Sequence, residues 1–283
     1  MTSLNDCYTL FNGVLIPSVG YGTWQTESGA ATEMAVTDAL RAGYRHIDTA
    51  AAYGNEESVG IGIKHSGINR QNIFLTTKLW NNIRGYDETI AACEESMLKL
   101  NVDYLDLFLI HWPNPLKYRA VWKEKNADTW RAFERLLADG KVRSIGVSNF
   151  CVRHLDALLE TADIPPHVNQ IRLCPGDIDG DTINYCKTRN ILIEAYSPFG
   201  TGKAFNSEII KEIAEKYEKS ISQICLRWSL QNGYLPLPKA VTTEHIIENT
   251  KIFNFSLEQE DINLLNSIEG ECGLQGNPDE KPF

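Results

Sequence analysis

Apolar and polar positions alternate between two patterns along the chain. Short runs rich in branched and aromatic residues, typical of buried strands, are separated by longer stretches with apolar residues at helical spacing. One such stretch begins with the capping pair Ser220 and Gln223 and ends before Gly233. This alternation predicts an α/β fold in which helices connect parallel strands. The runs span residues 45–48, 73–80, 104–112, 142–149, 167–173, 191–197 and 234–239.

Further segments lie before and after these units. Tyr8–Leu10 and Val14–Ile16 flank an Asn-Gly pair, which favours a tight turn and predicts an N-terminal β-hairpin. Val19–Gly22 fits a first strand of the main sheet. A last helix is followed by Gly270–Phe283, where three glycines and two prolines predict an irregular tail.

Polar residues end these runs at a mean spacing of about 32 residues, the size of one strand–helix–strand unit. The length of 283 residues is close to the roughly 250 that a barrel of eight such units requires. A doubly wound sheet would gather strand ends only near its switch point. We therefore expect one (β/α)8 TIM-barrel domain over residues 1–283, with its site at the carboxyl ends of the strands. The strand-end residues are Asp48, Lys78, His111, Asn149, Gln170, Tyr196 and Lys239.

Composition narrows the class of function. The chain has 27 Lys and Arg against 37 Asp and Glu, a formal net charge of −10, and no basic run, which argues against a nucleic-acid binder. It has no apolar run of about 18 residues and no signal-like N-terminal segment, so we expect neither membrane spanning nor secretion. Seven scattered cysteines without a CxxC pair indicate neither a disulfide framework nor a zinc site. We expect a cytoplasmic protein without a bound metal.

Four residues are candidates for acid–base chemistry. Lys78 lies in an apolar strand, so its ammonium either extends to solvent or pairs with an anion such as Asp48. Tyr53 follows Asp48 in a loop of small residues, and an adjacent ammonium is expected to lower its pKa from about 10, making it a usable proton donor. His111 ends the most apolar run; alone it reads as a core residue, but with the other three it could orient a substrate oxygen.

These residues lie in motifs that resemble the aldo-keto reductase family, in particular its bacterial aldehyde and diketogluconate reductases. Gly43–Ala50, with Tyr53 and Asn55-Glu56 after it, matches a family signature without a mismatch. The other matching motifs follow in the family's order: Gly20–Trp24, Thr77–Trp80, Asp103–Pro113, Gly140–Phe150 and Ala195–Pro198. The resemblance covers nearly the whole chain. It implies carbonyl reduction by hydride from a reduced nicotinamide, with Tyr53 as general acid beside Asp48, Lys78 and His111.

The resemblance also implies a cofactor site. Ser148, Asn149 and Gln170 are similar to the family's clamp on the nicotinamide carboxamide, and neutral donors and acceptors suit an amide. Tyr196 would stack on the ring. Without the resemblance, Asn149 reads as the N-cap of the next helix and Tyr196 as a core aromatic. The other expected cofactor residues are Thr23, Trp24, Asp48, Ser197, Phe199, Thr201, Lys239, Val241, Thr242, His245, Glu248 and Asn249.

The chain departs from the family where the adenosine 2′-phosphate is gripped. Ala240 replaces the usual hydroxyl residue, and His245 replaces the usual arginine. An imidazole lacks the permanent charge and bidentate fork of a guanidinium. We therefore expect Lys239 to favour NADPH, with NADH as a weaker alternative. The preference for NADPH over NADH should be smaller than in relatives that carry the arginine, and it should depend on pH. Arg172 and Cys174 also replace an acidic residue and a histidine that are usual in relatives.

Tryptophans adjoin the candidate site. Trp24, Trp80 and Trp112, with Tyr53 and His111, predict an aromatic-walled pocket for hydrophobic or small aldehydes. Motifs that would indicate another kind of nucleotide or metal site are incomplete or absent. The segment after Gly20 lacks the third glycine of the dinucleotide fingerprint, and no P-loop or HExxH motif occurs.

Two classes of function remain open. The first is an NADPH-dependent carbonyl reductase that acts as a monomer on a small-molecule carbonyl substrate. The second is a regulatory or binding protein that keeps the reductase barrel and uses the state of its cofactor as a signal. The intact set of four catalytic candidates favours the enzyme.

Overall fold

Eight parallel strands form the centre of the molecule in the computed structural model, which describes residues 1–283. Each strand pairs with its neighbours in chain order, from β3 to β10. Hydrogen bonds from the amides of Gly20 and Gly22 to the carbonyls of Pro236 (3.1 Å) and Pro238 (2.9 Å) join the last strand to the first. The predicted (β/α)8 barrel is confirmed. The strands are β3 (Tyr21–Gly22), β4 (His46–Asp48), β5 (Phe74–Leu79), β6 (Leu107–Ile110), β7 (Ile145–Ser148), β8 (Val168–Arg172), β9 (Leu192–Tyr196) and β10 (Leu235–Leu237).

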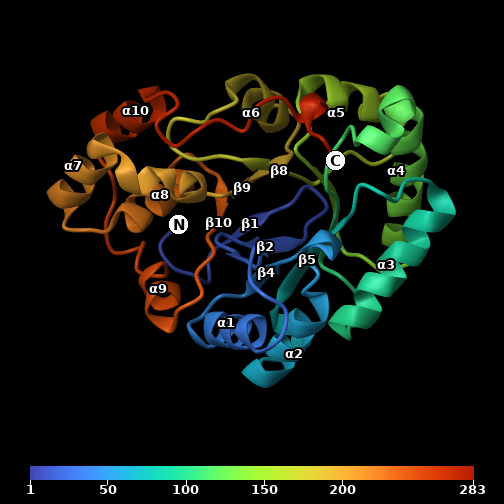
Figure 1. The fold of residues 1–283 in the computed structure, drawn as a ribbon, viewed down its shortest axis with the longest axis horizontal. Helices are drawn as coiled ribbons and strands as arrows, with labels where there is room; N and C mark the ends of the chain where they lie inside the picture. Colours follow the sequence, from blue (N-terminus) through green and yellow to red (C-terminus); the bar gives the residue numbers. More distant parts are fainter.

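Helices surround the strands on all sides (Figure 1). The capping box expected at Ser220 and Gln223 is present and begins one of them. No helix combines the length and apolar character needed to cross a membrane. The helices are α1 (Ala30–Arg41), α2 (Glu56–Ser66), α3 (Tyr86–Leu100), α4 (Trp122–Ala138), α5 (Val152–Leu159), α6 (Gly180–Lys187), α7 (Glu208–Tyr217), α8 (Ile221–Gln231), α9 (Thr243–Glu248) and α10 (Gln259–Ser267).

The predicted N-terminal hairpin is also confirmed. β1 (Cys7–Thr9) and β2 (Leu15–Pro17) pair antiparallel around a turn in which Gly13 adopts a positive φ of 85°. Leu10 and Ile16 belong to a cluster with inward-facing strand residues, so the hairpin packs against the interior of the barrel. The strand members of this cluster are Phe74, Leu107, Leu109, Val168, Leu235 and Leu237.

Strand periodicity places apolar and polar groups in different parts of the barrel. In β6, Leu107 and Leu109 belong to the inner cluster, whereas Phe108 and Ile110 pack in the larger cluster shared with the helices. On β4 and β5 the register pairs Asp48 with Thr76, two residues before Lys78. The apolar inner layer therefore gives way to polar side chains toward the carboxyl ends of the strands, as barrel folds require for a site there.

Candidate active site

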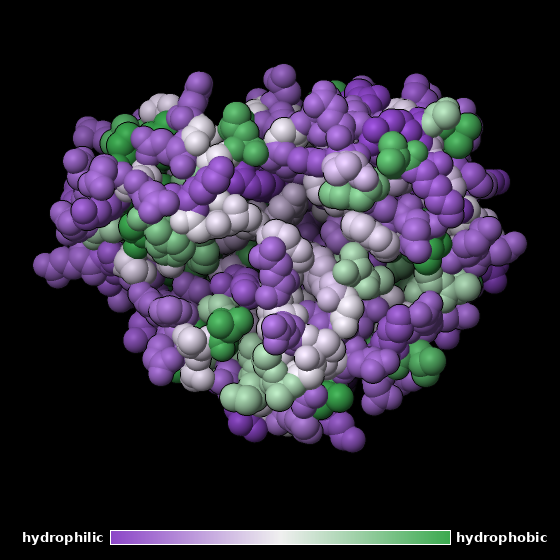
Figure 2. Space-filling view, viewed as in Figure 1, coloured by the Kyte–Doolittle hydropathy of each residue, from purple (hydrophilic) through white to green (hydrophobic).

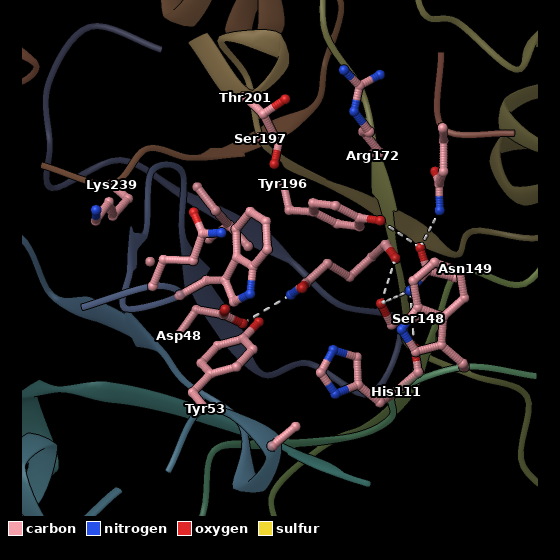
Figure 3. Close-up of a pocket in the computed structure, with 18 of the residues that line it drawn as sticks. Asp48, Tyr53, His111, Ser148, Asn149, Arg172, Tyr196, Ser197, Thr201 and Lys239 are labelled. Atoms are coloured by element: carbon pink, nitrogen blue, oxygen red, sulfur yellow. Dashed lines mark hydrogen bonds between the residues drawn. The ribbon is translucent and has the colours of Figure 1, made fainter. Parts of the chain in front are cut away.

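A cavity of about 750 Å³ opens at the carboxyl ends of the strands. Figure 2 shows the molecule hollowed near its centre on this face, and Figure 3 draws lining residues. The cavity brings together most of the site residues expected from the sequence. Those that line it are Trp24, Asp48, Tyr53, Trp80, His111, Trp112, Ser148, Asn149, Gln170, Tyr196, Ser197, Phe199, Thr201 and Lys239.

Lys78 lies beneath this cavity with its side chain 0% exposed. Its Nζ is 2.7 Å from Asp48 Oδ1 and 3.2 Å from the Tyr53 hydroxyl, and it donates to the Thr49 carbonyl at 2.8 Å. Burial acts to lower the pKa of Lys78, but Asp48 and Tyr53 together raise it above the ordinary value. The ammonium is therefore paired and retained, and the alternative of a chain end extending to solvent is wrong.

Tyr53 ends a short 3₁₀ turn, Ala51–Tyr53, that follows β4. Burial raises the pKa of its phenol, and the opposing effect of the Lys78 ammonium is smaller. The expectation that the ammonium brings this pKa toward neutrality is wrong for this geometry, because the phenolate loses more by desolvation than it gains from the charge. The hydroxyl consequently stays protonated and holds the proton that a general acid must give.

His111 directly follows β6 and faces the same space as Tyr53 and Asp48 (Figure 3). Its ring meets the Tyr53 ring edge-on at 5.8 Å and the Trp80 ring at 5.1 Å between centroids. Burial, with the charges of Lys78 and Arg84, lowers the pKa of His111 well below its ordinary value, so the imidazole is neutral. Its Nδ1 has no hydrogen-bond partner in the protein.

Ser148, Asn149, Gln170 and Tyr196 form a second group next to the first. The Tyr196 hydroxyl donates to Asn149 Oδ1 at 2.7 Å, and Asn149 Nδ2 donates to the His111 carbonyl at 2.9 Å (Figure 3). The alternative that Asn149 caps the next helix is wrong, because Cys151 is the N-cap of α5. Asn149 instead adopts a left-handed φ of 63°. The second group therefore presents neutral amide and hydroxyl groups to the cavity.

The outer cofactor residues are spread more widely. Lys239 reaches the cavity and is exposed, and the exposed His245 lies on the short helix α9. Thr23 is buried and donates from its hydroxyl to the Asp48 carbonyl at 3.1 Å. The expected cofactor residues that do not line the cavity are Thr23, Val241, Thr242, His245, Glu248 and Asn249.

One wall comes from the tail, which sequence reasoning left out of the site. Phe283 packs its ring 5.8 Å from that of Trp80 and 5.2 Å from that of Trp112. Arg172 donates to the carbonyls of Cys272 (2.7 Å) and Gly273 (2.9 Å), which fixes the start of this segment. Apolar residues in an otherwise polar tail were the available signal, but they do not show where the tail folds. The tail residues that line the cavity are Leu274, Gln275, Lys281 and Phe283.

Fold and site together define a class of protein: a TIM barrel with a buried lysine–aspartate pair, a protonated tyrosine and a neutral histidine at its carboxyl rim. Residues 18–269 match the model of the Aldo/keto reductase family. The chain belongs to this family.

Relatives of known sequence and structure align over most of their length. Glyoxal reductase from Bacillus subtilis (strain 168) is 46% identical over 282 residues, covering 100% of this chain and 99% of the relative. The crystal structure of an aldo-keto reductase from a Medee basin deep-sea metagenome library is 40% identical, with a TM-score of 0.91 and coverage of 98% and 100%. A mutant of Gox0644 in complex with NADPH is 37% identical, with a TM-score of 0.89 and coverage of 98% and 99%.

Proposed function

We propose that this protein is an NADPH-dependent carbonyl reductase in which Tyr53 protonates the substrate oxygen. The observation that carries the proposal is the contact of the buried Lys78 ammonium with both Asp48 and Tyr53. Family membership supports carbonyl reduction by an oxidoreductase. The name of the Bacillus relative supports small aldehydes as substrates, and the Gox0644 complex supports NADPH. We further propose that residues 1–283 act as one domain and as a monomer.

The polar groups of the cavity fit a nicotinamide nucleotide. At the inner end, Gln170 lines the cavity, and its side-chain amide oxygen Oε1 has no hydrogen-bond partner in the protein. At the outer end, the cation Lys239 suits a phosphate. In the proposed complex, Ser148, Asn149 and Gln170 hold the carboxamide and the Tyr196 ring lies against the nicotinamide. Ser197, Phe199 and Thr201 hold the pyrophosphate. When bound, the reduced nicotinamide supplies the hydride that goes to the carbonyl carbon.

The chain's own residues then manage charge on the substrate oxygen. The Tyr53 hydroxyl donates its proton as negative charge develops there, and the Lys78 ammonium 3.2 Å away stabilises the phenolate left behind. Asp48 keeps Lys78 charged and fixed in place. The neutral His111 imidazole orients the carbonyl oxygen. Trp24, Trp80 and Trp112 line the pocket and favour an apolar substituent.

A panel of small carbonyls assayed with both cofactors tests the proposal. We expect oxidation of NADPH with dicarbonyls such as glyoxal and with aromatic aldehydes, and slower oxidation of NADH. NADPH binding without turnover of any carbonyl would overturn the enzyme and leave the regulatory or binding class. Size-exclusion chromatography with light scattering on the same sample tests the monomer.

A further inference from the structure

Glu194 is a buried acid that the proposed chemistry does not use. It lies on β9 between Leu192 and Tyr196, which both pack with the inner cluster, and its side chain is 0% exposed. Its Oε2 accepts from Gln170 Nε2 at 2.8 Å. Its Oε1 has no hydrogen-bond partner and lies 3.8 Å from His46 Nε2. The acid therefore has one strong contact, and that contact leads to a cofactor residue.

Gln170 is held from two sides. Its Nε2 donates to Glu194 Oε2 and also to Asp48 Oδ2, each at 2.8 Å. A primary amide nitrogen carries two hydrogens, so both are used. Rotation of the amide by 180° would turn its oxygen toward two acid oxygens, of which the Asp48 carboxylate accepts only. The nitrogen is consequently fixed toward the barrel interior, and the side-chain oxygen Oε1 is left without a partner in the protein, at a residue that lines the cavity.

We propose that Glu194 is a positioning residue for the nicotinamide ring: with Asp48 it fixes the Gln170 amide so that its acceptor faces the cavity. The inference rests on the proposed function, since the expected ligand of that acceptor is the N–H of the nicotinamide carboxamide. With Asp48 alone, one N–H of Gln170 would lack a partner inside the barrel and would be free to turn toward the cavity. A fixed acceptor binds the N–H side of the carboxamide and not its oxygen, and it thereby fixes the orientation of the nicotinamide ring.

The charges around Glu194 are compatible with this role. Burial, followed by the nearby Asp48 carboxylate, raises the pKa of Glu194 to about 8, so the group is mostly protonated at neutral pH. A protonated carboxyl still offers an acceptor oxygen to Gln170. The facing groups are His46 and Asp48 on β4, Lys78 on β5 and Gln170 on β8. Burial lowers the pKa of His46 to about 3, so it is neutral. Lys78 thus keeps one ionised partner, Asp48.

Two substitutions at position 194 distinguish the effect of losing the hydrogen-bond acceptor from the effect of changing the side-chain volume. Glu194→Gln keeps a carbonyl oxygen in reach of Gln170, whereas Glu194→Met fills similar space without a strong acceptor. We expect the Kd for NADPH, measured by fluorescence titration without substrate, to rise about tenfold in Glu194→Met, as for loss of a buried hydrogen bond. Glu194→Gln should stay within about twofold of the unaltered protein. Circular dichroism and a thermal unfolding curve establish that each variant is folded.

A Gln170→Ala background tests whether Glu194 acts through Gln170. We expect Glu194→Met to have no further effect on the Kd in that background. An effect of the same size with and without Gln170, or a Kd unchanged in Glu194→Met, would overturn the positioning role. Failure of the proposed function is distinguishable. If NADPH does not bind the unaltered protein, both fall; if the Kd changes as expected but no carbonyl turns over, only the enzyme proposal falls.

Discussion

At Tyr53 two effects on one phenol oppose each other. The Lys78 ammonium favours the phenolate, whereas burial disfavours it more strongly, and the net effect raises the pKa. Such a hydroxyl keeps its proton until negative charge appears on a substrate oxygen, and the ammonium then stabilises the anion formed. The same rule explains Glu194, which burial keeps protonated beside an ionised Asp48. Around the Lys78–Asp48 ion pair, Tyr53 and Glu194 are thus both kept neutral by burial.

The protonation of Glu194 predicts a change in the pH dependence of stability. Its pKa is raised from the ordinary 4.5 to about 8 on folding, so the stability it contributes is fully present below pH 4.5 and is lost as the pH rises through 8. Relative to Glu194→Gln, the free energy of unfolding of the unaltered protein should fall by about 1.4 kcal/mol per pH unit across this window. Urea unfolding of both proteins at several pH values measures it. A constant difference between the two would contradict a raised pKa.

The sequence predicted which residues form the candidate site, but it predicted the pKa shift of Tyr53 in the wrong direction. Asp48, Lys78 and His111 each end an apolar run, Tyr53 follows Asp48 in a loop of small residues, and the resemblance implied the same four residues. The direction of the Tyr53 pKa shift depends on burial, which spacing along the chain does not reveal. Glu194 lies in an apolar run as well, but only the strand register shows that it meets Gln170 inside the barrel.

At the scale of elements, one buried side chain donates hydrogen bonds to the loops that follow two neighbouring strands, β5 and β6. Arg84, in the loop between β5 and α3, is 2% exposed and donates to the carbonyls of Trp80 (3.1 Å), Ile83 (2.7 Å) and Trp112 (2.6 Å). Burial lowers its pKa to about 9, so it remains charged at neutral pH. One buried guanidinium therefore links the two loops that carry tryptophans of the pocket wall.

Replacing this anchor should loosen the substrate wall. In Arg84→Met, three carbonyls lose their charged donor, and we expect the free energy of unfolding to fall by about 2–3 kcal/mol. The KM for the carbonyl substrate should rise, because Trp80 and Trp112 line the pocket, while the Kd for NADPH stays constant. Urea unfolding and steady-state kinetics measure both effects.

Arg131→Met is the matched control, since Arg131 is exposed on α4 and pairs only with Asp128 on the surface. It should leave stability and KM unchanged. An Arg84→Met protein that kept the KM of the unaltered protein would show that the loop carbonyls do not position the wall.

The sequence predicted the boundaries of the strands more closely than the position of the tail. Each predicted strand matches one of the structure to within three residues at either end, because runs of branched residues between turn signals are local features. The tail has no period, and its place over the pocket depends on distant anchors. Arg172 holds its start, and Asp279 meets Asn114, Arg153 and His154. Such contacts join positions 100 or more residues apart.

At the scale of the whole molecule, the net charge of −10 opposes binding of an anionic cofactor. Affinity then depends on a few local cations at the outer end of the cavity. Lys239 lines the cavity, and His245 stands on α9 at the position where the resemblance to the family implies an arginine.

A positive charge added at position 245 should therefore change the affinity for NADPH more than a positive charge added away from the cavity. We expect His245→Arg to lower the Kd for NADPH about fivefold, as for an exposed charge-assisted contact, without changing the Kd for NADH. His65→Arg, on the exposed side of α2, adds the same charge away from the cavity and is the control. Equal gains for both cofactors in His245→Arg would contradict a 2′-phosphate contact. Fluorescence titration with each cofactor measures them.

The central claim is that the Tyr53 hydroxyl protonates the substrate oxygen, and Tyr53→Phe tests it most directly. With Tyr86→Phe on the surface of α3 as control, kcat is compared for an aldehyde that the unaltered protein reduces, and the Kd for NADPH is measured in parallel. We predict a fall in kcat of at least about 100-fold in Tyr53→Phe, with the Kd within about twofold. A Tyr53→Phe protein that retained most of its kcat would contradict the account.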